Sequence, residues 1–268
     1  MIDTEITPKP PAVQNLLDLA DKVAIVTGSS GGIGTGIARR FAEAGASVVA
    51  HYYRNRDAAE AIVRAIDTYG GEACPVQADV TKRVDVEQLL ARALEAFGRV
   101  DILVNNAGVY PLASVIEMTD DSWRTVIDTN LSGVSLCTQV IARHMIGQGA
   151  GGAIVNIASI EGEMPAPMHS HYSAAKAGVL MHTNAAAREL GIHGIRVNAV
   201  SPGLIWRDGL ERDWPDGIRR YREAAPLGRL GLSDDVADAC LFLASPAARW
   251  ITGASLRVDG GVMTNTPY

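Results

Sequence analysis

The chain has 268 residues, 47% of them hydrophobic and 20% charged, which is the composition of a globular protein with a large buried core. Its formal net charge of -6 argues against a nucleic-acid-binding surface, since a polyanion requires clustered positive charge. The sequence has no apolar run of membrane-spanning length, and its start lacks the basic and apolar regions of a secretory signal. Three widely spaced cysteines without metal-ligand spacing favour a reducing cytoplasm over a disulfide framework or a zinc site: Cys74, Cys137 and Cys240.

Residues 1–20 are expected to form an N-terminal arm, loose around its prolines, and residues 21–268 to form one domain. From Val23 onward, short β-branched runs alternate with longer helical patterns, as in VAIVT followed by IGTGIARRFAEAG. The later apolar runs of this kind are SVVAHYY, ACPVQA, DILVN, GAIVNIAS, RVNAV and SLRVD. This alternation is typical of βαβ units, and it predicts an α/β fold with a doubly wound parallel sheet of about seven strands, a Rossmann fold.

The segment TGSSGGIG, residues 27–34, follows the first predicted strand and opens the first predicted helix. Its glycines Gly28, Gly32 and Gly34 permit a tight turn and a close approach of the backbone to a ligand. The free N–H groups and the positive end of the following helix favour a pyrophosphate. The spacing differs from the G-x-G-x-x-G dinucleotide fingerprint, so this interpretation depends on the position of the segment between a strand and a helix.

Residues 159–176 carry a hydroxyl, a phenol and an ammonium group, and we expect these three groups to lie close together. Tyr172 and Lys176 are four residues apart in an alanine-rich stretch, so they are expected on one helix face about a turn apart. The ammonium is then expected to lower the pKa of the phenol. Ser159 follows the apolar run AIVNIA, a predicted strand ending at residue 158 or 159, and the carboxyl ends of such strands bind ligands. An isolated Tyr–Lys pair is usually a surface feature, so further motifs must support this interpretation.

The alternation of strands and helices is interrupted between Pro202 and Pro226. Five apolar residues recur there at helix-like spacing: Trp206, Leu210, Trp214, Ile218 and Tyr221. This spacing predicts a small helical lid at about residues 203–226 that would cover a substrate. The alternative is an ordinary connecting loop with helical turns.

Several motifs in a fixed order resemble those of the short-chain dehydrogenase/reductase family. They are TGSSGGIG, Asn105-Asn106-Ala107-Gly108, Asn130, Ser159, Tyr172-Ser173-Ala174-Ala175-Lys176, Pro202-Gly203 and Asp259-Gly260-Gly261. The resemblance extends from about residue 21 to residue 263. Within the family, the set of motifs is most similar to that of 3-oxoacyl-[acyl-carrier-protein] reductases.

The resemblance implies catalytic roles for four residues. Tyr172 would exchange a proton with the substrate oxygen, and Ser159 would hydrogen-bond and orient that oxygen. Lys176 would lower the pKa of the phenol and bind the nicotinamide ribose, and Asn130 would hold a water in a relay towards solvent. Donors arranged in this way stabilise the charge that develops on oxygen while a hydride moves to or from carbon.

The resemblance also implies which residues bind the cofactor. Asp79 and Val80 would meet the adenine at the end of the third strand, and Asp79 could equally prepare the start of a helix. The complete expected set is Gly28, Ser30, Gly32, Ile33, Gly34, Tyr52, Arg54, Asp79, Val80, Asn106, Ala107, Gly108, Tyr172, Lys176, Pro202, Gly203 and Ile205. No metal site is expected, because this hydride chemistry needs none.

The choice of cofactor depends on the end of the second strand. Family members that prefer NAD usually carry an Asp there, whereas this chain has Tyr52. Arg54, and also Arg56, could grip a 2′-phosphate through a guanidinium group. The basic residue often found in the glycine-rich turn of NADP-using members is replaced here by Gly31. Taken together, these residues predict a preference for NADP(H) over NAD(H).

Some residues near the expected substrate depart from the family pattern. Arg207 stands where a Thr is common, and it could reach phosphates or an acidic substrate. The alternative for Arg207 is a solvated helix face balanced by neighbouring acids. His169 and His171 flank the approach to the catalytic tyrosine, so they either line the pocket or are polar rim residues. Met164 and Trp206 are further pocket candidates.

The sequence therefore predicts an NAD(P)-dependent oxidoreductase that interconverts a secondary alcohol and a ketone. A 3-oxoacyl thioester is the first expected substrate, and a cyclic, sugar-like or aromatic alcohol is the alternative. The alternative of another class is a dinucleotide-sensing binding protein, which the intact Ser–Tyr–Lys–Asn set disfavours. The expected partner is a small carbonyl or alcohol, with no nucleic acid and no membrane. Family members suggest a homotetramer with helices near residues 120–146 and 172–190 at an interface.

Overall fold

One sheet of seven parallel strands forms the centre of the computed structural model, which describes residues 10–264. The strands are β1 (Val23–Val26), β2 (Ser47–Tyr52), β3 (Ala73–Gln77), β4 (Ile102–Asn105), β5 (Gly152–Ile157), β6 (Ile195–Pro202) and β7 (Ser255–Val258). Their order is β3-β2-β1-β4-β5-β6-β7, so the direction of winding reverses between β1 and β4. The predicted doubly wound α/β fold is confirmed, and the reversal marks the edge at which such sheets bind ligands.

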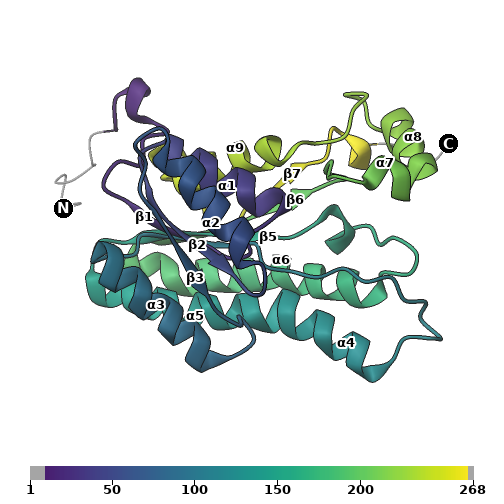
Figure 1. Ribbon diagram of the computed structural model, residues 1–268, viewed down its shortest axis with the longest axis horizontal. Helices are drawn as coiled ribbons and strands as arrows, with labels where there is room; N and C mark the ends of the chain where they lie inside the picture. The colour runs from purple at the N-terminus through teal and green to yellow at the C-terminus, as the bar shows by residue number, and fades with distance from the viewer. Residues whose placement is uncertain (1–9, 265–268) are drawn as a thin grey trace, which may run out of the picture.

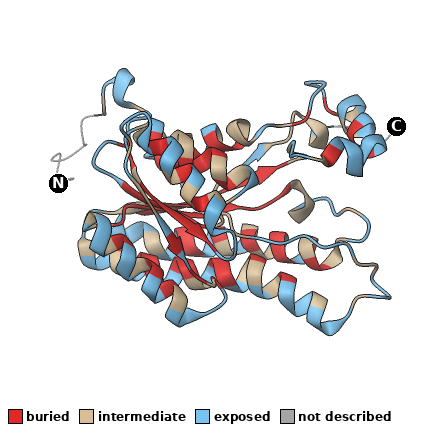
Figure 2. Cartoon of the chain, viewed as in Figure 1, coloured by how far each residue is buried: buried red, intermediate tan, exposed pale blue. Residues whose placement is uncertain are grey.

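Helices cover both faces of the sheet, as Figure 1 shows. The α-helices of the described residues are α1 (Gly32–Glu43), α2 (Arg56–Asp67), α3 (Arg83–Phe97), α4 (Asp120–Ile127), α5 (Gly133–Gln148), α6 (Ser170–Leu190), α7 (Leu210–Asp213), α8 (Pro215–Ala224) and α9 (Ser233–Ala244). Helices α1, α2 and α9 lie on one face, and α3, α5 and α6 lie on the other (Figure 1). Because both faces are covered, β1 and β4 are buried along their whole length (Figure 2).

The hydrophobic core has two layers, one on each side of the sheet. Phe41 of α1 belongs to the first layer together with Val236 of α9. Ile141 and Met145 of α5 belong to the second, together with Ile154 of β5. These layers fix the strands, and therefore also the loops at their carboxyl ends, where the candidate site lies.

Two boundaries differ from the predicted ones. The helical region near residues 120–146 is interrupted, because α4 ends at Ile127 and the π-helical turn Asp128–Ser132 precedes α5. Strand β5 ends at Ile157, so Ser159 lies in the loop beyond it and caps the short 3-10 turn Ile160–Gly162. Single π-turns frequently occur at functional positions, and Asn130 lies in the middle of this one.

The segment predicted as a lid contains two short helices. Helix α7 ends before Trp214, and Pro215 starts α8, because proline is well suited to the first position of a helix. Leu210 and Ile218 are buried against Leu230, so these helices have a small apolar core of their own. The helix-like spacing predicted neither the break between the helices nor which of its residues are buried. Trp206 and Trp214, two of the five, are 43% and 47% exposed.

The N-terminal arm is attached to the domain within its described part. Leu19 is buried and its N–H donates to the carbonyl of Ala44 at 2.8 Å, while the N–H of Ala247 donates to the carbonyl of Leu16 at 2.9 Å. The expectation of a loose arm around Pro8 falls outside the described residues. Between residues 10 and 264, no helix combines the length and apolar character that crossing a membrane requires.

Candidate active site

Ser159 and Tyr172 bring two hydroxyl groups together at the carboxyl end of β5. Ser159 is buried, and its Oγ accepts a hydrogen bond from the N–H of Glu161 at 3.1 Å. Its hydroxyl also lies close enough to that of Tyr172, the third residue of α6, to lower the pKa of the phenol. The two hydroxyls therefore lie on one side of the site, where a single substrate oxygen could accept a hydrogen bond from each.

Burial raises the pKa of Tyr172 to about 12. The hydrogen bond from Ser159 acts in the opposite direction, and the charge of Glu161 adds to the rise. The expected lowering by Lys176 is not found, because its Nζ lies 5.6 Å from the tyrosine ring centroid and donates to the carbonyl of Ile157 at 2.6 Å. In this arrangement the phenol is held neutral, as a proton donor requires.

Lys176 is buried, with 4% of its surface exposed, and loss of solvation lowers its pKa to about 8. It lies one turn after Tyr172 on α6, as predicted from their spacing. An ammonium group with this pKa can both bind a ligand hydroxyl and exchange a proton near neutral pH.

Asn130 fixes the loop that follows β4. Its side chain is fully buried, with Oδ1 accepting from the N–H of Val109 at 2.9 Å and Nδ2 donating to the carbonyl of Val109 at 2.6 Å. A Cβ at Gly108 would lie 2.5 Å from Oδ1, so glycine is required there for close packing. Because the side chain is used in this way, a water relay through Asn130 would use its backbone carbonyl in the π-turn.

The glycine-rich turn divides into packed and open positions. Gly28 has a φ of +66°, and a Cβ on it would lie 2.9 Å from the Cα of Ala107, while a Cβ on Gly34 would overlap the carbonyl of Gly28. By contrast, no heavy atom lies within 4 Å of the Cβ positions at Gly31 and Gly32. No side chain caps the N-terminus of α1, so no capping side chain occupies its first N–H groups.

Asn106 ties this turn to the loop after β4. Its Nδ2 donates to the carbonyls of Thr27 and Gly28 at 2.9 and 3.0 Å. The Oγ1 of Thr27 in turn accepts from the N–H groups of Asn106 and Ala107. The side chain of Asn106 is therefore committed to the turn, and a cofactor would meet the backbone of this loop.

The end of β2 presents one cation without an acidic partner among the described residues. Tyr52 is buried, whereas Arg54 is exposed and stacks over the ring of Tyr53, with Cζ 5.0 Å from the ring centroid. Arg56 forms an ion pair with Glu60 at 2.7 Å. Arg54 rather than Arg56 is therefore placed to bind an added anion.

Asp79 lies two residues beyond β3 and is engaged locally. Burial alone would raise its pKa, but hydrogen bonds from Thr81 and the nearby Lys82 outweigh that effect and lower it. These contacts hold the turn between β3 and α3, but the cap position of α3 is Lys82, so Asp79 does not cap that helix. Val80 is buried next to it.

The loop after β6 leads from the site to the lid. A Cβ on Gly203 would overlap the hydroxyl of Tyr221, which donates to the carbonyl of Asp259 at 2.8 Å. Ile205, two residues further on, forms a β-bridge with Gly231. The loop from Pro202 through Ile205 is thus held to β7 and to the segment before α9.

Arg207 lies beyond this loop, at the start of the lid. Its nearest acidic partner is Asp213, with Nη1 and Oδ2 3.5 Å apart. Glu211 and Glu223 lie within ion-pair distance of other arginines of the lid. This pairing matches the alternative prediction of a solvated helix face balanced by acids.

A carboxylate–imidazole pair beside Tyr172 was not predicted. Glu161 Oε2 lies 2.9 Å from Nδ1 of His169, whose ring centroid is 5.7 Å from that of Tyr172. Tyr110 approaches Tyr172 edge-on at 6.3 Å. The one available signal for Glu161 was its position two residues after the predicted catalytic serine.

His171 is fully buried, and its Nδ1 accepts from the N–H of Tyr172 at 2.9 Å. The interpretation of His171 as a pocket or rim residue is therefore wrong. Its neighbour His169 is only partly buried, because it lies just before the first turn of α6, whereas His171 points into the packed side of that helix.

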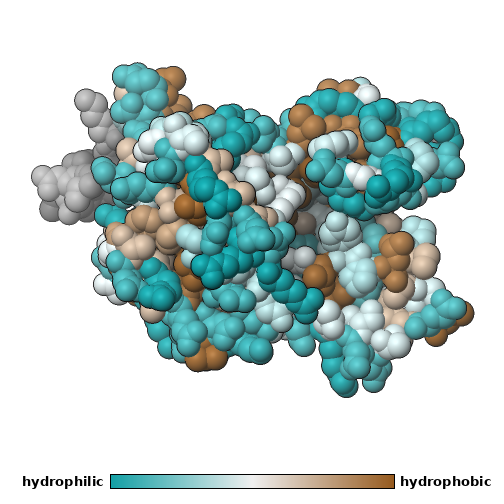
Figure 3. Space-filling view, in the orientation of Figure 1, coloured by the Kyte–Doolittle hydropathy of each residue, from teal (hydrophilic) through white to brown (hydrophobic). Residues whose placement is uncertain are grey.

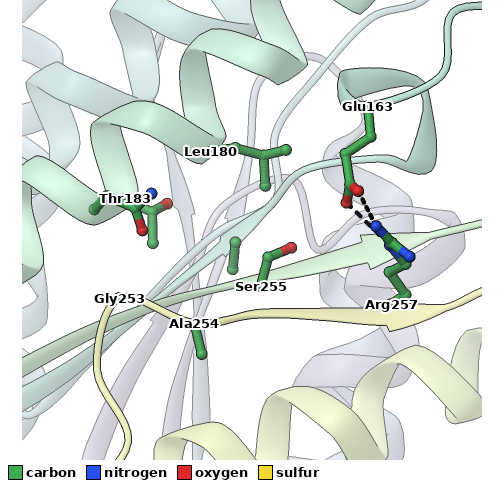
Figure 4. Close-up of a pocket in the computed structure, with 9 residues that line it drawn as sticks. Glu163, Leu180, Thr183, Gly253, Ala254, Ser255 and Arg257 are labelled. Atoms are coloured by element: carbon green, nitrogen blue, oxygen red, sulfur yellow. Dashed lines mark hydrogen bonds and ion pairs between the residues drawn. The ribbon is translucent and has the colours of Figure 1, made fainter.

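Two cavities in the surface of the described residues lie away from Ser159, Tyr172 and Lys176. One of about 460 Å³ lies beside α6, β6 and β7, and Figure 4 shows Arg257 paired with Glu163 at its rim. The other, of about 700 Å³, lies along β3 and α3. Neither is lined by Ser159, Tyr172 or Lys176, so neither is the candidate site. In residues 10–264, His, Cys, Asp and Glu form no group of three or more that could hold a metal ion.

Comparison with known proteins identifies the family. The model of the family described as enoyl-(acyl carrier protein) reductase matches residues 28–263. A 3-oxoacyl-[acyl-carrier-protein] reductase of Synechocystis sp. is 43% identical over 91% of this chain and 98% of its own length. The chain belongs to the short-chain dehydrogenase/reductase family. An L-rhamnose 1-dehydrogenase (NAD(P)(+)) of Azotobacter vinelandii is 44% identical over 92% of this chain and 98% of its own.

The solved structures agree with this assignment. The crystal structure of a short-chain type dehydrogenase/reductase from Mycobacterium marinum has a TM-score of 0.90 and 38% identity, and covers 95% of this chain and 100% of its own. The protein is therefore an oxidoreductase that interconverts a secondary alcohol and a ketone with a nicotinamide dinucleotide, as predicted. The open space over Gly31 and Gly32 at the uncapped end of α1 fits the pyrophosphate of such a cofactor.

Proposed function

We propose that Tyr172, Ser159 and Lys176 carry out the proton chemistry of carbonyl reduction. The observation that carries this proposal is the placement of the Ser159 hydroxyl near that of Tyr172 at the carboxyl edge of the sheet, with the buried Lys176 one turn further along α6. Both hydroxyls can donate to one oxygen, which fits the reduction of C=O, where oxygen takes up a proton. The arrangement offers less to a C=C bond, although the matching family model bears the name of an enoyl reductase.

Each of the three residues would have a separate role, which follows from its surroundings. Tyr172 gives its proton to the substrate oxygen, Ser159 orients that oxygen, and Lys176 returns a proton to the phenol. The nicotinamide supplies the hydride and the ribose hydroxyls that Lys176 would bind. The backbone carbonyl of Asn130, in the π-turn, would hold a water that connects Lys176 with solvent. The rest of the expected cofactor-binding set follows the carboxyl ends of β1, β2, β3, β4 and β6, and it would hold the remainder of the dinucleotide.

NADP(H) is the cofactor that the end of β2 favours. Tyr52 offers no carboxylate to a ribose 2′-hydroxyl, and Arg54 has no acidic partner among the described residues. A guanidinium group in this position can bind a 2′-phosphate through charge-assisted hydrogen bonds.

A 3-oxoacyl thioester is the substrate that the approach to the site fits best. Figure 3 shows the surface hollowed between the α7–α8 segment and the segments below it, with apolar side chains on both sides. The exposed apolar residues of these segments include Trp206 and Trp214 on the lid and Tyr110 and Leu112 after β4. Such a rim suits an acyl chain, and the lid would cover it.

A hydroxylated, sugar-like substrate is a second candidate. The polar pair Glu161–His169 beside Tyr172 offers hydrogen bonds that an acyl chain would leave unused. The relative from Azotobacter vinelandii bears the name of a sugar dehydrogenase, in agreement with this possibility.

Turnover of matched probes tests these proposals: acetoacetyl-coenzyme A and cyclohexanone with NADPH and NADH, and L-rhamnose with NADP+ and NAD+. Tyr172→Phe is expected to lower turnover by at least about a hundredfold while cofactor affinity stays within about threefold, because only the proton donor is lost. Tyr110→Phe, which removes a neighbouring phenol hydroxyl, serves as the control and should keep turnover within a few-fold. Retention of turnover in Tyr172→Phe would reject this assignment. A parent active on none of the probes would point to another substrate class.

We also propose a homotetramer in the cytoplasm. Apolar side chains stay exposed on the face formed by α5 and α6, including Ile146 and Met181. Free Cys74, Cys137 and Cys240 are compatible with a reducing compartment.

A further inference from the structure

His51 connects the two segments that border the expected adenosine site. It is the penultimate residue of β2, and only 1% of its surface is exposed. Its Nδ1 accepts from the N–H of Gly28 at 2.9 Å, and its Nε2 donates to the carbonyl of Ala78 at 3.0 Å. Its own carbonyl accepts from the N–H and the hydroxyl of Ser29, at 2.9 and 3.1 Å. One residue therefore holds both the glycine-rich turn and the end of β3.

Only one form of the imidazole satisfies both side-chain contacts. A backbone N–H can only donate and a backbone carbonyl can only accept, so the ring must be neutral with its proton on Nε2. Gly28 adopts a left-handed conformation and has no side chain of its own to fix its path. The bond to His51 holds the N–H of this residue, while a bond from Asn106 holds its carbonyl and Ala107 packs against it.

We propose that neutral His51 is a positioning residue, which holds the glycine-rich turn in the conformation that binds the dinucleotide. The proposal rests on the proposed use of this turn by a cofactor. His51 itself lies beneath the turn and acts through Gly28 and Ser29. It therefore affects NADH and NADPH alike, whereas Arg54 would distinguish between them.

Acid should weaken this support. A proton on Nδ1 would replace the acceptor by a second donor, opposite the N–H of Gly28. Burial opposes that protonation and lowers the pKa of His51, while the carboxylate of Asp79, beyond the end of β3, acts in the opposite direction. The other groups in contact with the ring are the backbone groups of Gly28 and Ala78, which do not titrate.

Two variants separate the hydrogen bonds from the charge. His51→Leu removes both ring contacts, and His51→Asn keeps an acceptor near the position of Nδ1 but cannot be protonated. His193→Asn is the matched control, because His193 is exposed in the turn after α6. Dissociation constants of NADH and NADPH are measured by protein fluorescence at about pH 7.5 and about pH 5.5, on either side of the ordinary histidine pKa.

At about pH 7.5, His51→Leu should weaken both cofactors by the same factor, roughly tenfold or more, since a buried N–H loses its acceptor. His51→Asn should stay within about threefold of the parent and should lose less affinity than the parent at about pH 5.5. Unchanged binding in a folded His51→Leu protein would overturn the proposal. So would an acid-induced loss of affinity that is the same in parent and His51→Asn.

Thermal unfolding of the protein without cofactor gives an independent readout. The pKa of His51 is lowered in the folded state, so its stabilising effect is present above the unfolded-state pKa of about 6.5 and is lost as the pH falls below it. The unfolding temperature of the parent should therefore fall more than that of His51→Asn between about pH 7.5 and about pH 5.5. Parallel curves would contradict the role of His51 even if His51→Leu fails to fold. A parent that binds neither cofactor would instead contradict the proposed function.

Discussion

At the scale of single residues, nearby charge, hydrogen bonding and burial together set the pKa of the Tyr172 hydroxyl. Burial and the negative charge of Glu161 favour the neutral phenol, and the hydrogen bond from Ser159 favours the phenolate. In alcohol oxidation the phenolate is the base, so kcat/KM should rise with pH as the proton leaves. Glu161→Gln removes a like charge, which lowers the pKa of Tyr172 and moves this rise to lower pH, by less than about one unit for a partly exposed carboxylate.

The pH profile of kcat/KM for oxidation of the best alcohol measures this shift. Glu163→Gln is the matched control, because Glu163 lies two residues further on and pairs with Arg257 instead. The control should leave the profile in place. An unshifted profile in Glu161→Gln, or an equal shift in both variants, would show that Glu161 does not act on the phenol.

Arg54 should decide between the two cofactors. A charge-assisted contact to the 2′-phosphate typically contributes about 1.5–3 kcal/mol, so Arg54→Ala should weaken NADPH roughly tenfold to a hundredfold and NADH by less than about threefold. Dissociation constants of both cofactors test this. Arg56→Ala is the control, since Arg56 already pairs with Glu60 and should have little effect. Equal losses for both cofactors, or a parent that prefers NADH, would mean that Arg54 faces solvent.

At the level of elements, the turn between β1 and α1 contains glycines with different tasks. A Cβ on Gly34 would lie 2.6 Å from Nδ2 of Asn106 and overlap backbone, so Gly34→Ala should destabilise the protein by about 1–3 kcal/mol. Gly31 has extended backbone and open space, so Gly31→Ala should change stability by less than about 0.5 kcal/mol. NADP-using family members often carry a basic side chain at this position, so the methyl group should also leave cofactor affinity unchanged.

Denaturant unfolding and cofactor binding together separate these tasks. Gly34→Ala should lose stability and affinity, and Gly31→Ala, the control, should keep both. Equal stability of the two variants would show that the turn relaxes around a side chain at Gly34. A loss of affinity in Gly31→Ala would show that the cofactor lies too close to this position to admit a side chain.

Elements defined by local pattern could be predicted, and those defined by packing could not. The strands and the Tyr172–Lys176 face follow from apolar periodicity and helix spacing, which the sequence carries directly. The π-turn at Asn130 depends on a contact with Val109 from another loop, and the burial of His171 depends on which side of α6 is packed. His51 was overlooked because a histidine in an apolar strand shows neither its partners nor its tautomer before the turn and β3 are in place.

At the level of the whole molecule, two surfaces apart from the rim of the site keep apolar side chains exposed and bear on the proposed tetramer. Met181 on α6 is 67% exposed, and Trp250, before the edge strand β7, is 97% exposed. A tetramer with dihedral symmetry needs at least two different self-complementary interfaces, since one such interface closes a dimer and stops. The two surfaces match that requirement, with α6 lying in the region expected from the sequence.

Introducing a negative charge into either surface should therefore prevent the tetramer from forming and leave dimers. Met181→Glu and Trp250→Glu are each expected to give dimers of the 28.3 kDa chain, and the double variant to give monomers, because a buried unpaired carboxylate strongly opposes association. Light scattering coupled to size exclusion measures the masses. Ala61→Glu is the control and should stay tetrameric, because Ala61 is exposed on α2, which covers the other face of the sheet from α6 and packs at the end of the sheet opposite β7. A tetramer that survives both single changes would mean that other surfaces hold the subunits together. A parent that is already dimeric would mean that only one of the two surfaces is buried, and the single variant that yields monomers would identify it.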